Sequence, residues 1–160
     1  MNAVRVGILG AVVVLVVTGC TASRTSDVPV TLPLDVPAPP PLDSSAVDIG
    51  AAVYRSSCAA CHGPNLEGAA DWKDRNDDGT WRPPPMDSTG HTWHHSDSLL
   101  TNIITNGSND PDSAMVGWGE SLSTAEIAAV IEFFKSTWGP DERAFQWTVT
   151  WQETQRGETG

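Results

Sequence analysis

The stretch Cys58-Ala59-Ala60-Cys61-His62 decides how the rest of this chain is interpreted. Two thiols separated by two residues and followed at once by a histidine form the spacing that attaches a c-type haem. The cysteines lie about one helical turn apart, so both sulfurs can reach the vinyl groups along one edge of a porphyrin. His62 then lies beneath the iron and becomes its proximal axial ligand. We therefore predict one haem c per chain, bound covalently by Cys58 and Cys61.

Two other chemistries use cysteines at this spacing. A thioredoxin-like redox pair belongs to a strand–helix–strand neighbourhood, and a structural zinc site needs a second pair of ligands. The sequence around residues 58–62 provides neither of these. Haem attachment is therefore the interpretation that the local sequence favours.

Residues 1–20 have the features of a targeting segment. Arg5 precedes an apolar and glycine run over residues 6–17, which is shorter than the roughly 20 residues of a membrane span and fits a signal-peptide core. The run ends in Val17-Thr18-Gly19-Cys20, which resembles a bacterial lipobox, so we expect lipid on Cys20. Lipidation would also account for the third cysteine, because a free thiol outside the cytoplasm is a liability. An ordinary signal peptide or an uncleaved anchor is the alternative.

The next segment, residues 21–45, is rich in proline and is predicted to be a linker. Each proline fixes its own φ and lacks a backbone donor, so the segment should be extended and semi-rigid. It would hold a domain over residues 46–140 at some distance from a membrane, followed by a C-terminal extension over residues 141–160. Trp147 and Trp151 in that extension are expected to lay a short helix or strand onto the domain, with disorder beyond residue 155.

The chain is acidic, with a formal net charge of -11 and a sequence pI near 4.5. This charge argues against nucleic acid as a partner and favours a basic redox protein. Solubility is the simpler explanation of the same charge.

A second pattern precedes the haem motif. Gly50, Tyr54 and Cys58 are spaced by four residues, so they share one face of a helix expected over residues 46–57. Together with the haem motif, this pattern resembles class I cytochromes c, in which a glycine and an aromatic residue precede the first haem cysteine. The resemblance covers roughly residues 46–138. It implies an all-α fold of about three or four helices around one haem, with the first helix crossing a C-terminal one.

A C-terminal helix is well marked in the sequence. Ser123-Thr124-Ala125-Glu126 is a capping box, and the helix should continue to about residue 137. Its apolar residues recur at helical spacing: Ile127, Val130, Ile131 and Phe134. A further helix is expected over residues 98–105 and ends at Asn106-Gly107.

The family places its distal methionine in a loop shortly before the terminal helix, and Met115 matches that place. A thioether is a soft, neutral ligand that stabilises ferrous iron and raises the reduction potential. Met86 is the rival, although it follows three prolines and lies far from the terminal helix in sequence. Either methionine could instead fill space in the core.

The middle of the chain holds three further features. In the cytochromes that this chain resembles, a proline carbonyl often accepts the second N–H of the proximal histidine, and one residue of Pro83-Pro84-Pro85 should do so for His62.

The segment from Asp74 to Gly79 matches the opening of a calcium loop, but Pro85 stands where the twelfth-position glutamate should be, which favours a simple turn.

The stretch His91-Thr92-Trp93-His94-His95 is the most ambiguous one. His91 and His95 are four residues apart and would share a helix face, so a zinc or copper site is conceivable. Histidines at the surface or at the haem edge are the alternative, because Ser96-Asp97 has the features of a helix start.

These features together predict an extracytoplasmic, lipid-anchored electron carrier with His62 and Met115 as axial ligands. Iron with both axial positions filled has no open site, so we expect neither enzymatic activity nor a small-molecule substrate. A haem enzyme or gas sensor with an open distal site is one alternative. A metal-handling lipoprotein that uses the His91–His95 cluster is another.

Overall fold

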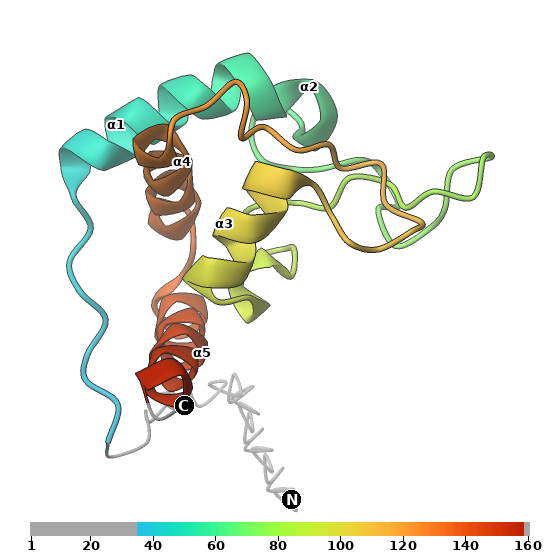
Figure 1. Ribbon diagram of the computed structural model, residues 1–160. Coiled ribbons are helices and arrows are strands. Elements are labelled where there is room, and N and C mark those ends of the chain that lie inside the picture. The colour runs from blue at the N-terminus through green and yellow to red at the C-terminus, as the bar shows by residue number, and fades with distance from the viewer. Residues whose placement is uncertain (1–34, 159–160) are drawn as a thin grey trace, which may run out of the picture.

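The computed structural model describes residues 35–158, which form helices joined by long loops (Figure 1). Within this range the β pairing consists of isolated bridges, so the predicted all-α architecture is confirmed. The elements are α1 (Ser44–Val53), the π-helical turn η1 (Tyr54–Cys58), α2 (Ala59–His62), the 3₁₀ turn η2 (Thr92–His94), α3 (Asp97–Asn106), α4 (Thr124–Ser136) and α5 (Pro140–Glu158). Residues 1–34, with the predicted signal peptide and Cys20, lie outside the described part of the chain.

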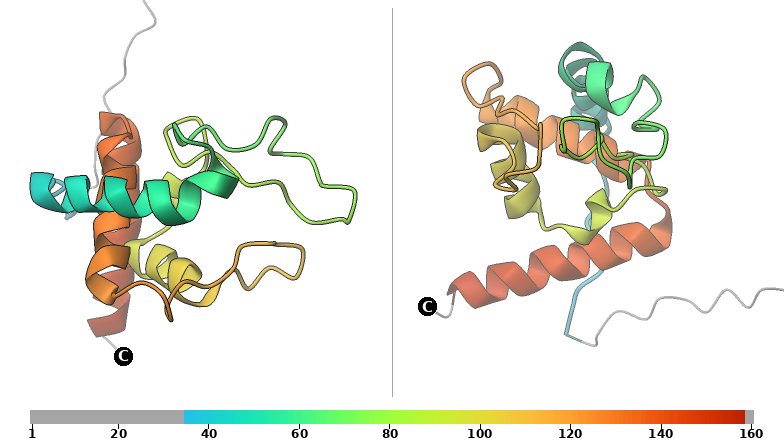
Figure 2. Two further views of the ribbon diagram at one scale, coloured as in Figure 1. Left: turned by 90° about the horizontal axis from the view of Figure 1, so that it is seen from above. Right: turned by 90° about the vertical axis from the view of Figure 1, so that its right-hand side faces the viewer.

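The crossing of α1 over α4 forms the centre of the fold (Figure 2, left). A Cβ atom at Gly50 would lie 2.0 Å from the carbonyl oxygen of Ala129, so only glycine permits this approach. Next to the crossing, the ring of Tyr54 packs against Phe133 and Phe134, with centroid separations of 5.5 and 6.0 Å. The predicted roles of Gly50 and Tyr54 in helix packing are confirmed.

Helix α4 begins as predicted. The Ser123 hydroxyl accepts the N–H of Glu126, and the Glu126 carboxylate accepts the N–H of Ser123 at 2.9 Å, which completes the capping box. The apolar residues predicted for its inner face are all buried: Ile127, Val130, Ile131 and Phe134.

The C-terminal extension differs from the prediction. It is one continuous 19-residue helix, α5, rather than a short helix or strand that becomes disordered after residue 155. Its start carries ordinary helix signals, because Pro140 occupies the first position and Asp141 and Glu142 lie in the first turn. The helix packs Phe145 against Trp93 of η2, with ring centroids 5.5 Å apart.

The end of the predicted linker also differs from the prediction. Its described part, from residue 35 to the N-cap Asp43 of α1, follows the side of the molecule that holds α5 (Figure 1). Trp147 Nε1 donates to the Pro37 carbonyl at 2.6 Å, Arg143 donates to the Pro40 carbonyl at 3.0 Å, and Val36 is buried. This part of the segment therefore contacts α5.

Among the described residues, no helix has both the length and the apolar character that crossing a bilayer requires.

Candidate cofactor site

Two long loops extend from the helices on one side of the molecule, residues 63–91 and 107–123 (Figure 1). Their outer parts are joined where Trp81 N donates to the Asp112 carbonyl at 2.8 Å and Arg75 forms an ion pair with the Asp112 carboxylate at 2.8 Å. These loops, together with α2 and α3, line a mainly apolar cavity of about 470 Å³. The cavity brings together residues that are far apart in sequence, including Cys58, His62 and Met115.

His62 is buried at the end of α2 and lines this cavity. Its Nδ1 atom lies 2.9 Å from the carbonyl oxygen of Pro84. A carbonyl only accepts, so Nδ1 carries the proton and Nε2 keeps a lone pair for a metal. Burial lowers the pKa of His62, while the bond to Pro84 opposes this effect. The imidazole is therefore held neutral and oriented, which is the state that ligates iron.

The position of Pro84 follows from a set of backbone bonds between the segment after His62 and the prolines. Gly68 N donates to the His62 carbonyl at 2.7 Å, and Ala69 N donates to the Pro83 carbonyl at 2.8 Å. Gly68 has φ +68°, and a Cβ atom there would lie 2.4 Å from the Pro85 nitrogen. The close contact thus requires glycine, and it fixes Pro84 rather than Pro83 or Pro85 as the partner of His62.

Tyr54 supports the same histidine from the other direction. Its hydroxyl donates to the Gly63 carbonyl at 2.6 Å and lies 3.2 Å from the His62 carbonyl. Burial raises the pKa of Tyr54, so the phenol remains a donor across the physiological pH range. The sequence did not predict this second role of Tyr54. Tyr54 and His62 are eight residues apart, and the chain between them includes the wide π-helical turn η1, which departs from regular α-helical spacing.

The two cysteines lie differently with respect to the cavity. Cys58 is half-buried and lines it, whereas Cys61 is exposed. Burial, with a smaller contribution from Cys61, raises the pKa of the Cys58 thiol to about 11. Cysteine pairs that work by thiol exchange need the opposite shift, because the thiolate is the nucleophile. The electrostatics at Cys58 therefore disfavour the thioredoxin-like alternative.

Met115 lines the cavity from the second loop. Ser108 N donates to the Met115 carbonyl at 3.2 Å, and Trp118 N donates to the Ile104 carbonyl at 2.8 Å, so the loop is tied to the end of α3. A Cβ atom at Gly117 would lie 2.7 Å from the Thr105 carbonyl oxygen. The glycine therefore allows the chain around Met115 to approach the helix closely.

Met86 also lines the cavity, but it is attached to the segment that carries His62. Its N–H donates to the Leu66 carbonyl at 2.8 Å, and its carbonyl accepts from Trp138 Nε1 at 2.8 Å. The Thr92 hydroxyl donates a weak hydrogen bond to the Met86 sulfur at 3.6 Å. These contacts place Met86 in the core on the same side as Pro84 and give its thioether a partner.

The histidine-rich segment is divided between two environments. His91 and His95 line the cavity, whereas the ring of His94 lies 5.4 Å from that of Phe145 on α5. Between residues 35 and 158, no group of three or more His, Cys, Asp or Glu side chains is arranged to hold a metal ion.

The segment from Asp74 to Gly79 forms a turn. The Asp78 carboxylate accepts the N–H of Thr80 at 3.0 Å, and Asn76 N donates to the Thr80 carbonyl at 2.8 Å. Its polar groups therefore bond to one another, as the simple-turn interpretation predicted.

Comparison with known proteins places this cavity in context. Residues 45–134 match the family described as cytochrome c oxidase, cbb3-type, subunit III. Two curated relatives are named alcohol dehydrogenase (quinone), cytochrome c subunit, one from Gluconacetobacter polyoxogenes and one from Komagataeibacter europaeus. Each is 31% identical to this chain over 99 residues, which cover 56% of this chain and 19% of the relative.

The chain thus spans about a fifth of the length of these relatives (19%). The family match covers more than half of the chain and includes the Cys58–His62 motif, the Pro84 region and Met115. The cavity, with a neutral histidine at one wall and mainly apolar sides, fits a haem group. The chain therefore belongs to the family of c-type cytochrome domains described as cbb3-type cytochrome c oxidase subunit III, and it is an electron carrier that binds haem c.

Proposed function

We propose that this chain passes single electrons between redox proteins outside the cytoplasm, with its haem held by Cys58 and Cys61 and the iron between His62 and Met115. The observation that carries the proposal is the bond from His62 Nδ1 to the Pro84 carbonyl, 2.9 Å long, at the wall of a cavity that Met115 also lines. The haem supplies the reversible one-electron change, and the protein supplies its surroundings.

The residues of the chain have three tasks in this proposal. Pro84 orients His62 and keeps its Nε2 lone pair available, which increases the basicity of the ligand. Met115 offers a neutral sulfur that favours the ferrous state. The apolar lining, which includes Leu100 and Ile104, excludes water and thereby limits the solvent rearrangement that accompanies each electron transfer.

Filling both axial positions also argues for a carrier rather than an enzyme. A haem enzyme or gas sensor needs an open coordination site, and Met115 would have to lie away from the iron to provide one. The loop that carries Met115 is tied to α3 by backbone bonds, including Trp118 N to the Ile104 carbonyl. This attachment supports a fixed distal ligand.

The electron partner is proposed to be a membrane-associated redox protein. The curated relatives are cytochrome c subunits of a quinone alcohol dehydrogenase, which suggests that this domain can serve beside a larger redox enzyme. The formal net charge of -11 favours a partner with a basic surface.

Covalent attachment of the haem is the first test. After acid–acetone extraction of the purified protein, the colour should remain with the polypeptide, because two thioether bonds survive unfolding. The Cys58→Ala/Cys61→Ala double variant should release any haem that it binds. Recovery of the wild-type haem in the organic layer would contradict the proposal.

The location is tested separately, through Cys20. If this residue carries lipid, Cys20→Ser should abolish membrane association while the absorption spectrum of the secreted protein stays unchanged. A Cys20→Ser protein that remained in the membrane fraction would indicate an uncleaved anchor instead.

A further inference from the structure

The ring of His91 is held in a fixed place at the wall of the cavity. It stacks on Trp72 with ring centroids 5.4 Å apart and an interplanar angle of 12°, and the ring of His95 meets it edge-on at 5.4 Å. Both histidines line the cavity that His62 and Met115 also line. The His91 ring therefore has a defined orientation at the wall of this cavity.

One nitrogen of His91 has no hydrogen-bond partner among the described residues. Nδ1 is buried without a donor or acceptor in reach, so a proton on it would be an unsatisfied buried donor. Burial also lowers the pKa of His91, with a smaller contribution from His94, which favours the neutral ring. The single proton then belongs on Nε2, which is left as the donor of the ring.

Positively charged side chains also line this cavity, although the chain contains few of them. Only nine of the 160 residues are lysine or arginine, yet Lys73 and Arg82 both line the cavity, with Asp110 as the opposing carboxylate. Lys73 also lies over the Trp72 ring, 5.2 Å from its centroid, and Arg82 donates to the Ala70 carbonyl at 3.2 Å. The two positive charges would favour an anionic group on a ligand in this cavity.

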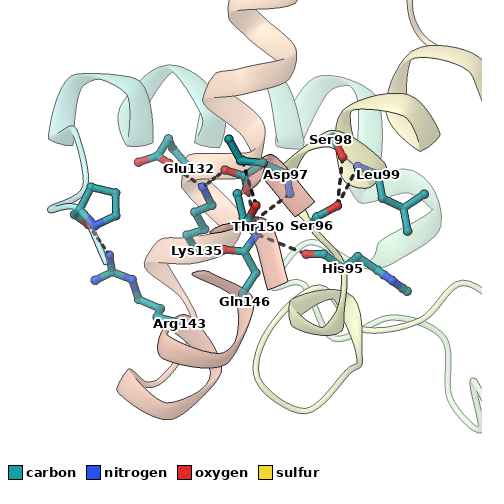
Figure 3. Close-up of polar contacts among 12 residues, drawn as sticks. His95, Ser96, Asp97, Ser98, Leu99, Glu132, Lys135, Arg143, Gln146 and Thr150 are labelled. Atoms are coloured by element: carbon teal, nitrogen blue, oxygen red, sulfur yellow. Dashed lines mark hydrogen bonds and ion pairs between the residues drawn. The ribbon is translucent and has the colours of Figure 1, made fainter. Parts of the chain in front are cut away.

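Helices α4 and α5 hold the segment that follows these histidines, through the contacts of His95 and Asp97 that Figure 3 draws. Gln146 of α5 donates to the His95 carbonyl at 3.2 Å and to the Asp97 carboxylate at 2.7 Å. Lys135 of α4 donates to the same carboxylate at 2.8 Å. Helix α5, which the sequence analysis did not predict at this length, thus keeps the backbone of His95 in place.

We propose that His91 Nε2–H donates a hydrogen bond to a propionate carboxylate of the haem, beside the positive charges of Lys73 and Arg82. This inference rests on the proposed function, because it requires the haem to be attached through Cys58 and Cys61. Thioether bonds to these cysteines hold one edge of the macrocycle, and the propionates belong to the opposite edge. A hydrogen bond to the propionate offsets part of its negative charge. This favours the ferrous state, whose positive charge is one unit lower than that of the ferric state.

The test compares three variants of the full-length holoprotein by reduction potential. His91→Leu removes the donor and should shift the potential downward. His91→Gln keeps an N–H donor and should stay nearer to the wild type. His94→Gln is the matched control, since His94 does not line the cavity, and it should leave the potential unchanged. Equal potentials for His91→Leu and His94→Gln, both with intact haem, would overturn the inference.

A second measurement does not depend on a variant that folds. In the reduced wild-type protein, proton NMR should show cross-relaxation between the His91 ring and the propionate methylene protons of the haem. Its absence, in a sample with assigned resonances for both groups, would also overturn the inference. Failure of the proposed function gives a different result, because the wild-type haem would then be extracted by acid–acetone.

Discussion

Gly50 and Ala129 meet where α1 crosses α4, and a Cβ atom at Gly50 would lie 2.0 Å from the Ala129 carbonyl oxygen. Because that oxygen belongs to a helical backbone, it cannot move aside as a flexible side chain would. The haem motif begins eight residues after Gly50, so a shift of α1 would also displace Cys58.

We therefore expect Gly50→Ala to lower the free energy of unfolding by about 2–3 kcal/mol, as overpacking in a core does. Denaturant unfolding of the holoprotein, followed by circular dichroism, measures this change. Gly157→Ala on α5 is the matched control, since no atom of residues 35–158 lies within 4 Å of an added Cβ there. It should be neutral or stabilising by up to about 1 kcal/mol. Similar losses for both variants would show that the close crossing is not the cause.

Tyr54 gives the second prediction. Tyr54→Phe keeps the ring packing against Phe133 but removes the hydroxyl that donates to the Gly63 carbonyl at 2.6 Å. The free energy of unfolding should fall by about 1–2 kcal/mol, because the part-buried Gly63 carbonyl keeps only the longer bond from Leu66 N, at 3.4 Å. The His62 carbonyl keeps the N–H of Gly68, so the haem spectrum should not change.

Ser136→Ala is the control for loss of a hydroxyl. Its Oγ atom donates to the Phe133 carbonyl at an exposed position, and the change should stay within about 0.5 kcal/mol. A Tyr54→Phe protein as stable as Ser136→Ala would refute a supporting role for the hydroxyl.

The sequence was most informative where function follows from short-range spacing. The haem motif, the face shared by Gly50 and Tyr54, and the capping box at Ser123 each depend on residues that are close in the chain. The structure therefore has the predicted elements there.

Contacts between distant segments were less predictable. The sequence restricts the partner of His62 to three prolines, and Pro84 is distinguished only by the pairing of residues 66–69 with residues 83–86. The docking of the proline-rich segment on Trp147 depends on a contact across 110 residues, which no local pattern encodes. The length of α5 had a local signal in Pro140 and the acidic first turn, but its polar sequence lacks a clear apolar stripe.

Gln146 gives the third prediction, which concerns α5. It is 2% exposed, and its amide bonds both the His95 carbonyl and the Asp97 carboxylate. Gln146→Leu should lower the free energy of unfolding by about 1–3 kcal/mol, because it buries an apolar side chain against two part-buried acceptors that lose this donor. Gln152→Leu, at an exposed position on the same helix, should change it by less than about 0.5 kcal/mol.

Hydrogen exchange provides a local readout for the same pair of variants. Gln146→Leu should speed amide exchange in the segment from His95 to Leu99, which α5 holds in place. Unchanged protection there, despite a loss of global stability, would mean that α5 does not fix this segment.

Met115 and Met86 both line the cavity, and the last prediction separates them. Met115→Ala should lower the reduction potential by on the order of 0.1 V, a fraction of the roughly 0.8 V span that axial ligands control. It should also let the ferrous protein bind carbon monoxide readily, because a coordination site becomes open. Met86→Ala should have neither effect, since the Met86 backbone is bonded to Leu66 and Trp138 on the side of His62. It should instead cost about 2–5 kcal/mol of stability through the space left in the core.

If Met86→Ala alone opens the iron, the ligand assignment is wrong although the carrier function stands. If the wild type already binds carbon monoxide readily, the distal site is open at rest and the protein is a sensor or an enzyme.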